Sequence, residues 1–156
     1  MIFKYLEHHN KLQVECPPKD YKPLKITAYR WIFDEGNPQN FQTQYEKFMK
    51  RYPNPSNPPK RYNDISDIEK QGTKMCEDMA YSMYVSVETA ENGFVFFLER
   101  YKEKTFEMFG KNIALAEISE QDGVNSKIDN NGHFNHHPAT TIDYEKKFQV
   151  VSCFIK

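Results

Sequence analysis

The alternation of polar and apolar residues divides the chain into extended and helical segments. The clearest extended segment is 25–33, where β-branched and aromatic residues fall on both faces between Pro23 and Gly36. Such a segment is typical of a strand at the centre of a sheet. Shorter segments of extended character predict further strands at residues 2–6, 11–15, 79–85, 112–119, 124–128, 133–137 and 148–155.

Two longer segments have the apolar spacing of an amphipathic helix. In 39–52, aromatic and Met side chains recur at intervals of three and four residues. A similar stripe in 87–104 follows Ser86, a residue suited to cap a helix N-terminus. Phe97 lies on this second stripe, so we expect it in the core. A third, short helix is expected at 64–70.

The order of these segments predicts one α+β domain over residues 1–156. We expect a mixed or mostly antiparallel sheet of five to seven strands, packed against two main helices. Four prolines lie in 53–59, and about seven residues form a surface loop more often than a domain boundary. A chain of 156 residues buries enough surface to fold without a metal or a disulfide.

Charge, hydrophobicity and cysteine content argue against a protein that binds nucleic acid through its overall charge, spans a membrane or is secreted. The formal net charge is −1, so no overall field attracts nucleic acid or an anionic membrane. The longest apolar run, 94–98, is far shorter than the roughly 20 residues of a membrane helix, and the charged N-terminal segment does not resemble a secretory signal. Cys16, Cys76 and Cys153 are odd in number and contain no C-x-x-C pair. This pattern favours reduced thiols and predicts a cytoplasmic protein.

A group of histidines raises the question of a metal. His133, His136 and His137 lie close together, with Asp129 and Asp143 nearby, and imidazole and carboxylate groups bind zinc or iron. On a strand, however, His136 points away from the other two. The segment also matches no established ligand spacing. We therefore expect a partly exposed strand end after a hairpin, and no metal.

The segment 41–62 combines basic and aromatic side chains, which suit contact with phosphates and stacking on bases. It is also typical of a solvated helix face followed by a loop. If it binds a protein or an RNA partner, the residues expected to do so are Lys50, Arg51, Arg61 and Tyr62.

Sequence motifs for nucleophilic catalysis are missing. No serine elbow, Walker loop or G-x-G-x-x-G motif is present. Cys76 is followed by Glu77 and Asp78, and nearby carboxylates raise the pKa of a thiol and make it less reactive.

Three separated residues carry a family resemblance. Arg30 lies on the first strong strand, Ser82 on a middle strand that leads into a helix, and Glu117 on a later strand. In this Arg–Ser–Glu order the chain resembles the ADP-ribosyltransferases. The resemblance implies that Arg30 binds the phosphates of NAD, and that Ser82 and Tyr84 line the nicotinamide-ribose pocket. It also implies that Glu117 stabilises positive charge at the anomeric carbon, a role suited to a carboxylate.

Two classes of function remain open. The resemblance implies an NAD-using, ADP-ribosyltransferase-like enzyme of small bacterial type, with Glu117 catalytic and NAD as cofactor. The alternative is a non-enzymatic interaction module that binds a protein or RNA partner through segment 41–62.

Overall fold

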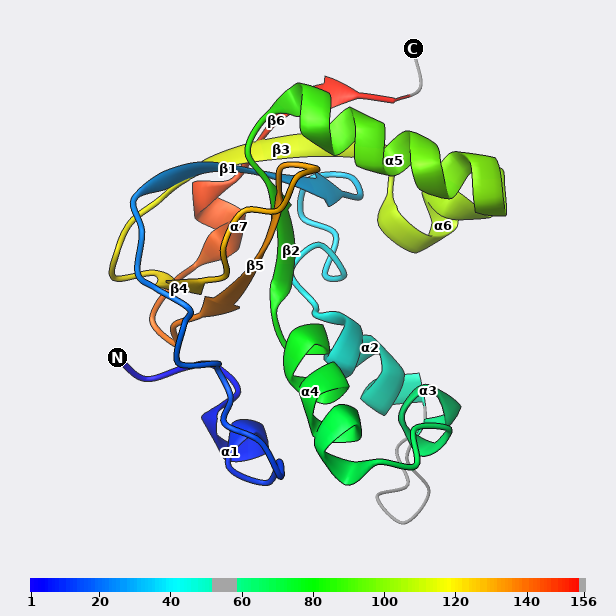
Figure 1. The fold of residues 1–156 in the computed structure, drawn as a ribbon. Coiled ribbons are helices and arrows are strands. Elements are labelled where there is room, and N and C mark those ends of the chain that lie inside the picture. The colour runs from blue at the N-terminus through cyan, green and yellow to red at the C-terminus, as the bar shows by residue number, and fades with distance from the viewer. Residues whose placement is uncertain (52–58, 155–156) are drawn as a thin grey trace.

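A six-stranded sheet with strand order β4-β5-β2-β1-β3-β6 organises the part of the chain that the computed structural model describes, residues 1–51 and 59–154 (Figure 1). Every neighbouring pair of strands is antiparallel. The strands are β1 (Ile26–Ile32), β2 (Tyr81–Tyr84), β3 (Asn112–Ile118), β4 (Gly123–Asn125), β5 (His133–Pro138) and β6 (Gln149–Cys153). The helices are α1 (Leu6–His9), α2 (Gln44–Arg51), α3 (Lys60–Asn63), α4 (Ile68–Asp78), α5 (Val87–Tyr101), α6 (Lys104–Phe109) and α7 (Tyr144–Lys147). The predicted α+β class, single domain and size of the sheet are confirmed.

The two faces of the sheet are covered by different helices. Ala28 and Ile32 of β1 face a core that also contains Tyr144 of α7. The intervening Trp31 faces the opposite side, where its Nε1 donates a hydrogen bond of 2.9 Å to the carbonyl of Ala90 in α5. Figure 1 shows α2, α3 and α4 grouped on one side of the sheet and α5 with α6 on another. β1 is therefore an interior strand between β2 and β3, with buried or partly buried residues on both faces, as its sequence predicts.

Helix α5 begins where its cap predicts. The side chain of Ser86 accepts a hydrogen bond from the Thr89 backbone N–H, and the Thr89 hydroxyl accepts one from the Ser86 backbone N–H, which completes a capping box. The helix ends at Tyr101, and a separate α6 follows. Phe94 is the fully buried ring of this helix. Phe97 is only half-buried, because it borders a cavity.

Other predicted segments differ from the structure. The strands expected at 2–6 and 11–15 are wrong. The first segment makes only the isolated bridge of Phe3 to Ala139 and leads into α1, and the second segment follows α1 as turns and bends. The helix expected at 64–70 starts later, at the Asp67 cap, and continues to the end of α4. The apolar spacing did not locate the start and end of α4, because helix caps and tertiary contacts determine where a helix begins and ends. The predicted loop 53–59 lies outside the described residues, apart from the buried Pro59.

A disulfide joins Cys16 to Cys76. It corrects the expectation that the cysteines are reduced, which was based on their odd number and wide separation. Residues 60 positions apart in sequence are brought together by the fold, and cysteine spacing alone does not show this. The argument for a cytoplasmic protein loses its cysteine support, since disulfides are typical of oxidising compartments. Among the helices described here, none has the length and apolar character required to span a membrane.

Candidate ligand-binding site

A cavity of about 450 Å³ lies where β1 and β2 separate. These strands pair at the single position Tyr29↔Tyr84, whereas β1 pairs with β3 along its whole length. Residues of β1, β2, β5, α2, α3, α5 and α6 line the space, together with the loop that follows β1. Its volume is in the range of small-molecule binding sites.

Arg30 bridges the gap between the two strands. Its Nη1 donates a hydrogen bond of 3.0 Å to the carbonyl of Ser82, and its Nε donates one of 3.1 Å to the carbonyl of Asn40. The guanidinium carbon also lies 4.9 Å from the centre of the Tyr81 ring. All these partners are uncharged. Burial lowers the pKa of Arg30 to about 10, so the group remains a cation at neutral pH, without a carboxylate to balance it.

Lys47 on α2 brings a second cation to the same cavity. Its Nζ lies 5.7 Å from the centre of the Phe33 ring. Burial, and then the positive charge of Arg30, lower the pKa of Lys47 to about 8. None of the described residues that line the cavity is Asp or Glu. Two cations thus repel each other across a space without a lining carboxylate, an arrangement that an anion stabilises.

Aromatic rings form one wall of the cavity. Trp31 stacks on Tyr84, with ring centres 5.2 Å apart, and Phe97 and Phe109 lie 5.7 and 5.2 Å from the Trp31 ring. Such a wall suits a planar apolar group. The site therefore combines positive charge with an aromatic surface.

Arg61 is the third basic residue that lines the cavity, and its charge is balanced by Asp78. Its Nε and Nη2 lie 2.7 and 3.0 Å from the two carboxylate oxygens of Asp78, which also accepts a hydrogen bond of 2.9 Å from the Tyr62 hydroxyl. Tyr62 is fully buried, so its ring is not available to stack on a base. Lys50 is exposed on α2, and the Arg51 side chain lies outside the described residues. The predicted partner-binding residues therefore do not form one described surface.

The structure brings together three of the four residues to which the family resemblance assigns a role. Arg30, Ser82 and Tyr84 all line the cavity. Glu117 does not: it is exposed on β3 opposite Thr27, and its Oε1 accepts a hydrogen bond of 2.7 Å from the Thr27 hydroxyl. Arg30 pairs with Ala114, three residues from Glu117, so alternation places the two side chains on opposite faces of the sheet.

A serine and a histidine that sequence spacing did not connect meet at the cavity. Ser82 Oγ lies 2.6 Å from His133 Nε2, and His133 Nδ1 lies 3.7 Å from the Asp129 carboxylate. Burial lowers the pKa of His133, so the imidazole is neutral at pH 7 and accepts a proton. Ser82 pairs with Asn135 and Tyr84 with His133, so the contact is diagonal across β2 and β5. Only the pairing of these strands shows this contact, because two helices and two strands lie between β2 and β5 along the chain.

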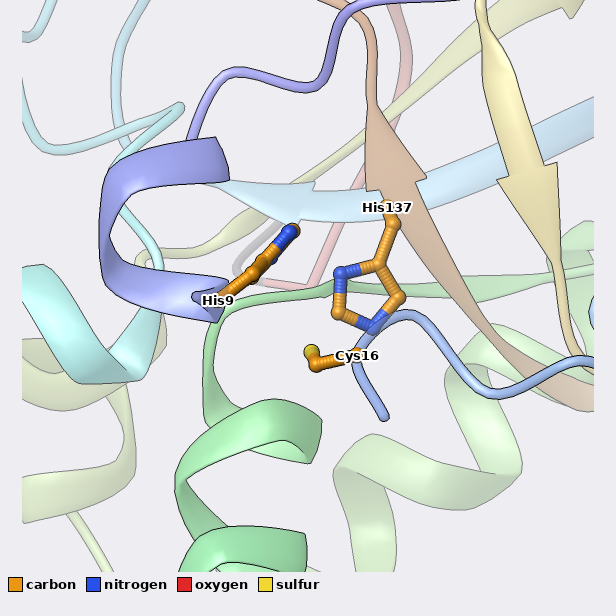
Figure 2. A group of neighbouring side chains, drawn as sticks. All are labelled: His9, Cys16 and His137. Carbon is orange, nitrogen blue, oxygen red and sulfur yellow. The ribbon is translucent and has the colours of Figure 1, made fainter. Parts of the chain in front are cut away.

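The other two histidines of the predicted group have different partners. His136 is fully buried, with its ring nitrogens 2.7 Å from Asn125 Oδ1 and 2.6 Å from the Tyr144 hydroxyl. His137 instead faces His9 and Cys16, as Figure 2 shows. The three neighbouring histidines therefore do not share one site.

Comparison with known proteins finds no matching family model, no similar curated protein and no similar solved structure.

Proposed function

We propose that the cavity binds a small phosphorylated ligand that carries a planar apolar group, as nucleotides do. One observation carries the proposal: the cations Arg30 and Lys47 share a cavity with an aromatic wall, and no acidic side chain lines it among the described residues. Phosphate oxygens accept hydrogen bonds from a guanidinium fork and from an ammonium group. The aromatic wall supplies a surface on which a base stacks.

NAD is the first ligand to test. Its pyrophosphate and two planar bases place it in the proposed class, and the sequence resemblance independently suggested it. Transfer of ADP-ribose needs, in addition, a carboxylate near the anomeric carbon. Because Glu117 does not line the cavity, the proposal is limited to binding.

The interaction module receives less support. Its aromatic residue Tyr62 is enclosed and its cation Arg61 is paired with Asp78. In the described part of segment 41–62, an RNA or protein partner would meet the exposed Lys50 and Lys60, together with Arg61, which is already paired.

A thermal-shift series tests the proposal by separating the two halves of the ligand. We would compare NAD and AMP with adenosine, which has the base without phosphate, and with inorganic phosphate. The expected result is a saturable rise in melting temperature for NAD or AMP that exceeds the rises with adenosine and phosphate, since a ligand at a hundred times its Kd adds about 2.7 kcal/mol. Equal shifts with AMP and adenosine, or no shift with either nucleotide, would contradict it.

A second candidate function rests on the contact of 2.6 Å between Ser82 and His133. Here Ser82 Oγ attacks an ester carbonyl and its proton passes to His133 Nε2. The alcohol leaves with that proton, and water then releases the acid and restores the serine. The nearby Arg30 favours an ester of an anionic acid.

An activity-based probe tests this second candidate. A fluorophosphonate should label the wild-type protein at Ser82 and the exposed-serine control S66A equally, but should not label S82A. The protein should also hydrolyse the aryl half-ester of a dicarboxylic acid. If S82A is labelled as strongly as S66A, Ser82 is not the nucleophile.

A further inference from the structure

A second cluster of potential ligands lies between α1, the loop after it, α4 and β5. Its members are His9, Cys16, Cys76 and His137. None of them lines the Arg30 cavity, so a site at this cluster is independent of the proposed function.

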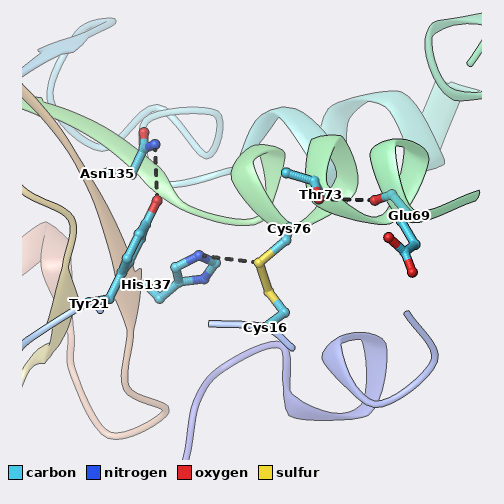
Figure 3. The surroundings of a disulfide bond; sticks show 7 residues. All are labelled: Cys16, Tyr21, Glu69, Thr73, Cys76, Asn135 and His137. Atoms are coloured by element: carbon cyan, nitrogen blue, oxygen red, sulfur yellow. Dashed lines mark hydrogen bonds between the residues drawn. A yellow bond between two sulfur atoms is a disulfide. The ribbon is translucent and has the colours of Figure 1, made fainter. Parts of the chain in front are cut away.

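The donor atoms of this cluster converge on one point. The candidate ligand atoms of His9, Cys16 and His137 all lie within 4.8 Å of one another (Figure 2). Cys76 is bonded to Cys16, and its Sγ lies 3.8 Å from His137 Nε2 (Figure 3). Three regions that are far apart in sequence therefore contribute the four donor atoms: the N-terminal segment with His9 and Cys16, α4 with Cys76, and β5 with His137.

Three of the four imidazole nitrogens of the cluster lack hydrogen-bond partners among the described residues. His9 Nδ1 and Nε2 and His137 Nδ1 are buried with no hydrogen bond to any residue that the structure describes. His9 is 3% exposed and His137 is 0% exposed. Buried polar groups are nearly always paired, and leaving them unpaired lowers stability. Three unpaired nitrogens in one place indicate that a partner of another kind completes the site.

Among the described residues, the groups next to the two imidazoles offer no substitute partner. His9 packs against Phe3, with ring centres 6.0 Å apart, and His137 packs against Tyr21 at 5.6 Å. The Tyr21 hydroxyl is engaged elsewhere, since it accepts a hydrogen bond of 3.5 Å from Asn135 Nδ2 (Figure 3). The surroundings are thus aromatic walls around sulfur and nitrogen donors.

We propose that His9, Cys16, Cys76 and His137 bind one Zn²⁺ when the Cys16–Cys76 disulfide is reduced. A thiol reductant converts the disulfide into two thiols and is itself oxidised to a disulfide. Each cysteine thiol then releases one proton as it binds the metal, so two protons leave for each Zn²⁺ bound. The disulfide and the zinc site are alternative states of the same two sulfurs.

The donor set identifies the metal class. Two thiolates and two imidazoles are a standard tetrahedral zinc set. With metal–ligand bonds of about 2.0–2.3 Å, neighbouring donors in a tetrahedron lie about 3.5 Å apart. The three donors that now lie within 4.8 Å therefore need to approach by roughly an ångström, and the two sulfurs to separate.

The metal would link the N-terminal segment to the sheet and to α4, as the disulfide links it to α4. Among the described contacts of that segment with the sheet are the isolated bridges Phe3↔Ala139 and Lys22↔Asn125. In a reducing compartment, such as the cytoplasm that the sequence suggested, the zinc form would maintain the attachment.

Cobalt(II) binding to the full chain tests the site. The protein is reduced with a phosphine, which takes up oxygen from water and is not a thiol competitor for the metal. The reduced protein should then bind one Co²⁺ with the visible absorption of a tetrahedral thiolate complex, and Zn²⁺ should displace it. The disulfide form should show no such spectrum. H9Q and H137Q should lose it, whereas the controls H8Q and C153S should retain it.

Alkylation of the reduced wild-type protein provides a second readout that needs no variant. Zn²⁺ should protect Cys16 and Cys76 from a thiol reagent and leave the rate at Cys153 unchanged. Absence of the tetrahedral spectrum in the reduced protein, the same spectrum in H9Q and H137Q, or unprotected Cys16 and Cys76 would each overturn the proposal.

Discussion

Lys47 is the residue whose charge state decides how the cavity binds an anion. Its pKa is lowered to about 8 by burial and by Arg30, so below that pH it is a cation that attracts an anion. Above that pH, Lys47 is deprotonated in the ligand-free protein. A bound phosphate favours the protonated form, and binding at higher pH must therefore take up a proton.

The affinity for a phosphorylated ligand should consequently depend on pH. We expect nearly constant affinity from pH 6 to 7.5 for a ligand that does not itself titrate there, such as NAD. Above about pH 8, affinity should fall by up to about tenfold per pH unit. Calorimetric titrations across this range measure the effect. In K47M the additional fall above pH 8 should disappear, and a wild-type affinity that rises over this range would contradict the assignment.

Single residues also show the limits of sequence reasoning. The sequence resemblance points to Arg30, Ser82 and Tyr84, and the structure places all three at one cavity. The sequence does not show that they meet, because the antiparallel pairing of β1 with β2 brings them together. Glu117 was selected with them but lies on the opposite face from Arg30. Only the register of β1 with β3 fixes that relation, and register is a long-range property.

At the level of the element, α5 shows why local propensity misleads. Gly93 lies in the middle of this helix, where glycine costs about 1 kcal/mol relative to alanine. The structure explains its presence: a Cβ atom there would lie 2.5 Å from the Tyr84 hydroxyl. Tyr84 is itself held by stacking on Trp31, so it has little room to move away.

G93A should therefore destabilise the protein despite its better helix propensity. Overpacking of this kind costs about 1–3 kcal/mol, and urea unfolding measures the loss. As a control, alanine at the exposed Asn92 of the same helix should be neutral or slightly stabilising. A more stable G93A protein would show that α5 does not approach β2 this closely.

The helices and strands that could be predicted are those whose burial or capping leaves a clear pattern in the local sequence. The strand at 25–33 and the helix that starts after Ser86 were predicted because burial on both faces and an N-cap leave strong local patterns. The strands expected at 2–6 and 11–15 were wrong. Tyr5 and Leu12 pack into a cluster with residues of α4 rather than forming a ladder, whereas Ile2 and Leu6 are exposed.

At the level of the whole molecule, the Cys16–Cys76 disulfide connects the N-terminal segment to α4 and closes a loop of 60 residues. In the chain-entropy account, such a crosslink restricts the unfolded state and stabilises the fold by about 4 kcal/mol. That amount is a large share of the roughly 5–15 kcal/mol by which a domain of this kind is stable.

Removing the crosslink should lower stability accordingly. C16S and C76S, measured by urea unfolding without reductant and with a chelator present, should each lose about 2–4 kcal/mol. C153S serves as the control and should change little, because Cys153 lies outside the disulfide. A loss below about 0.5 kcal/mol in both variants would show that the crosslink does not stabilise the protein.

The most direct test of the central claim is a calorimetric titration of the protein with NAD at pH 7, in the wild type, K47M and K50M. Lys47 lines the cavity, and Lys50 is exposed on the same helix, three residues away. We expect saturable binding that K50M retains and that K47M weakens by about ten- to a hundredfold, the effect of losing one hydrogen bond to a charged group. Equal affinity in all three proteins, or no binding by the wild type, would contradict the claim.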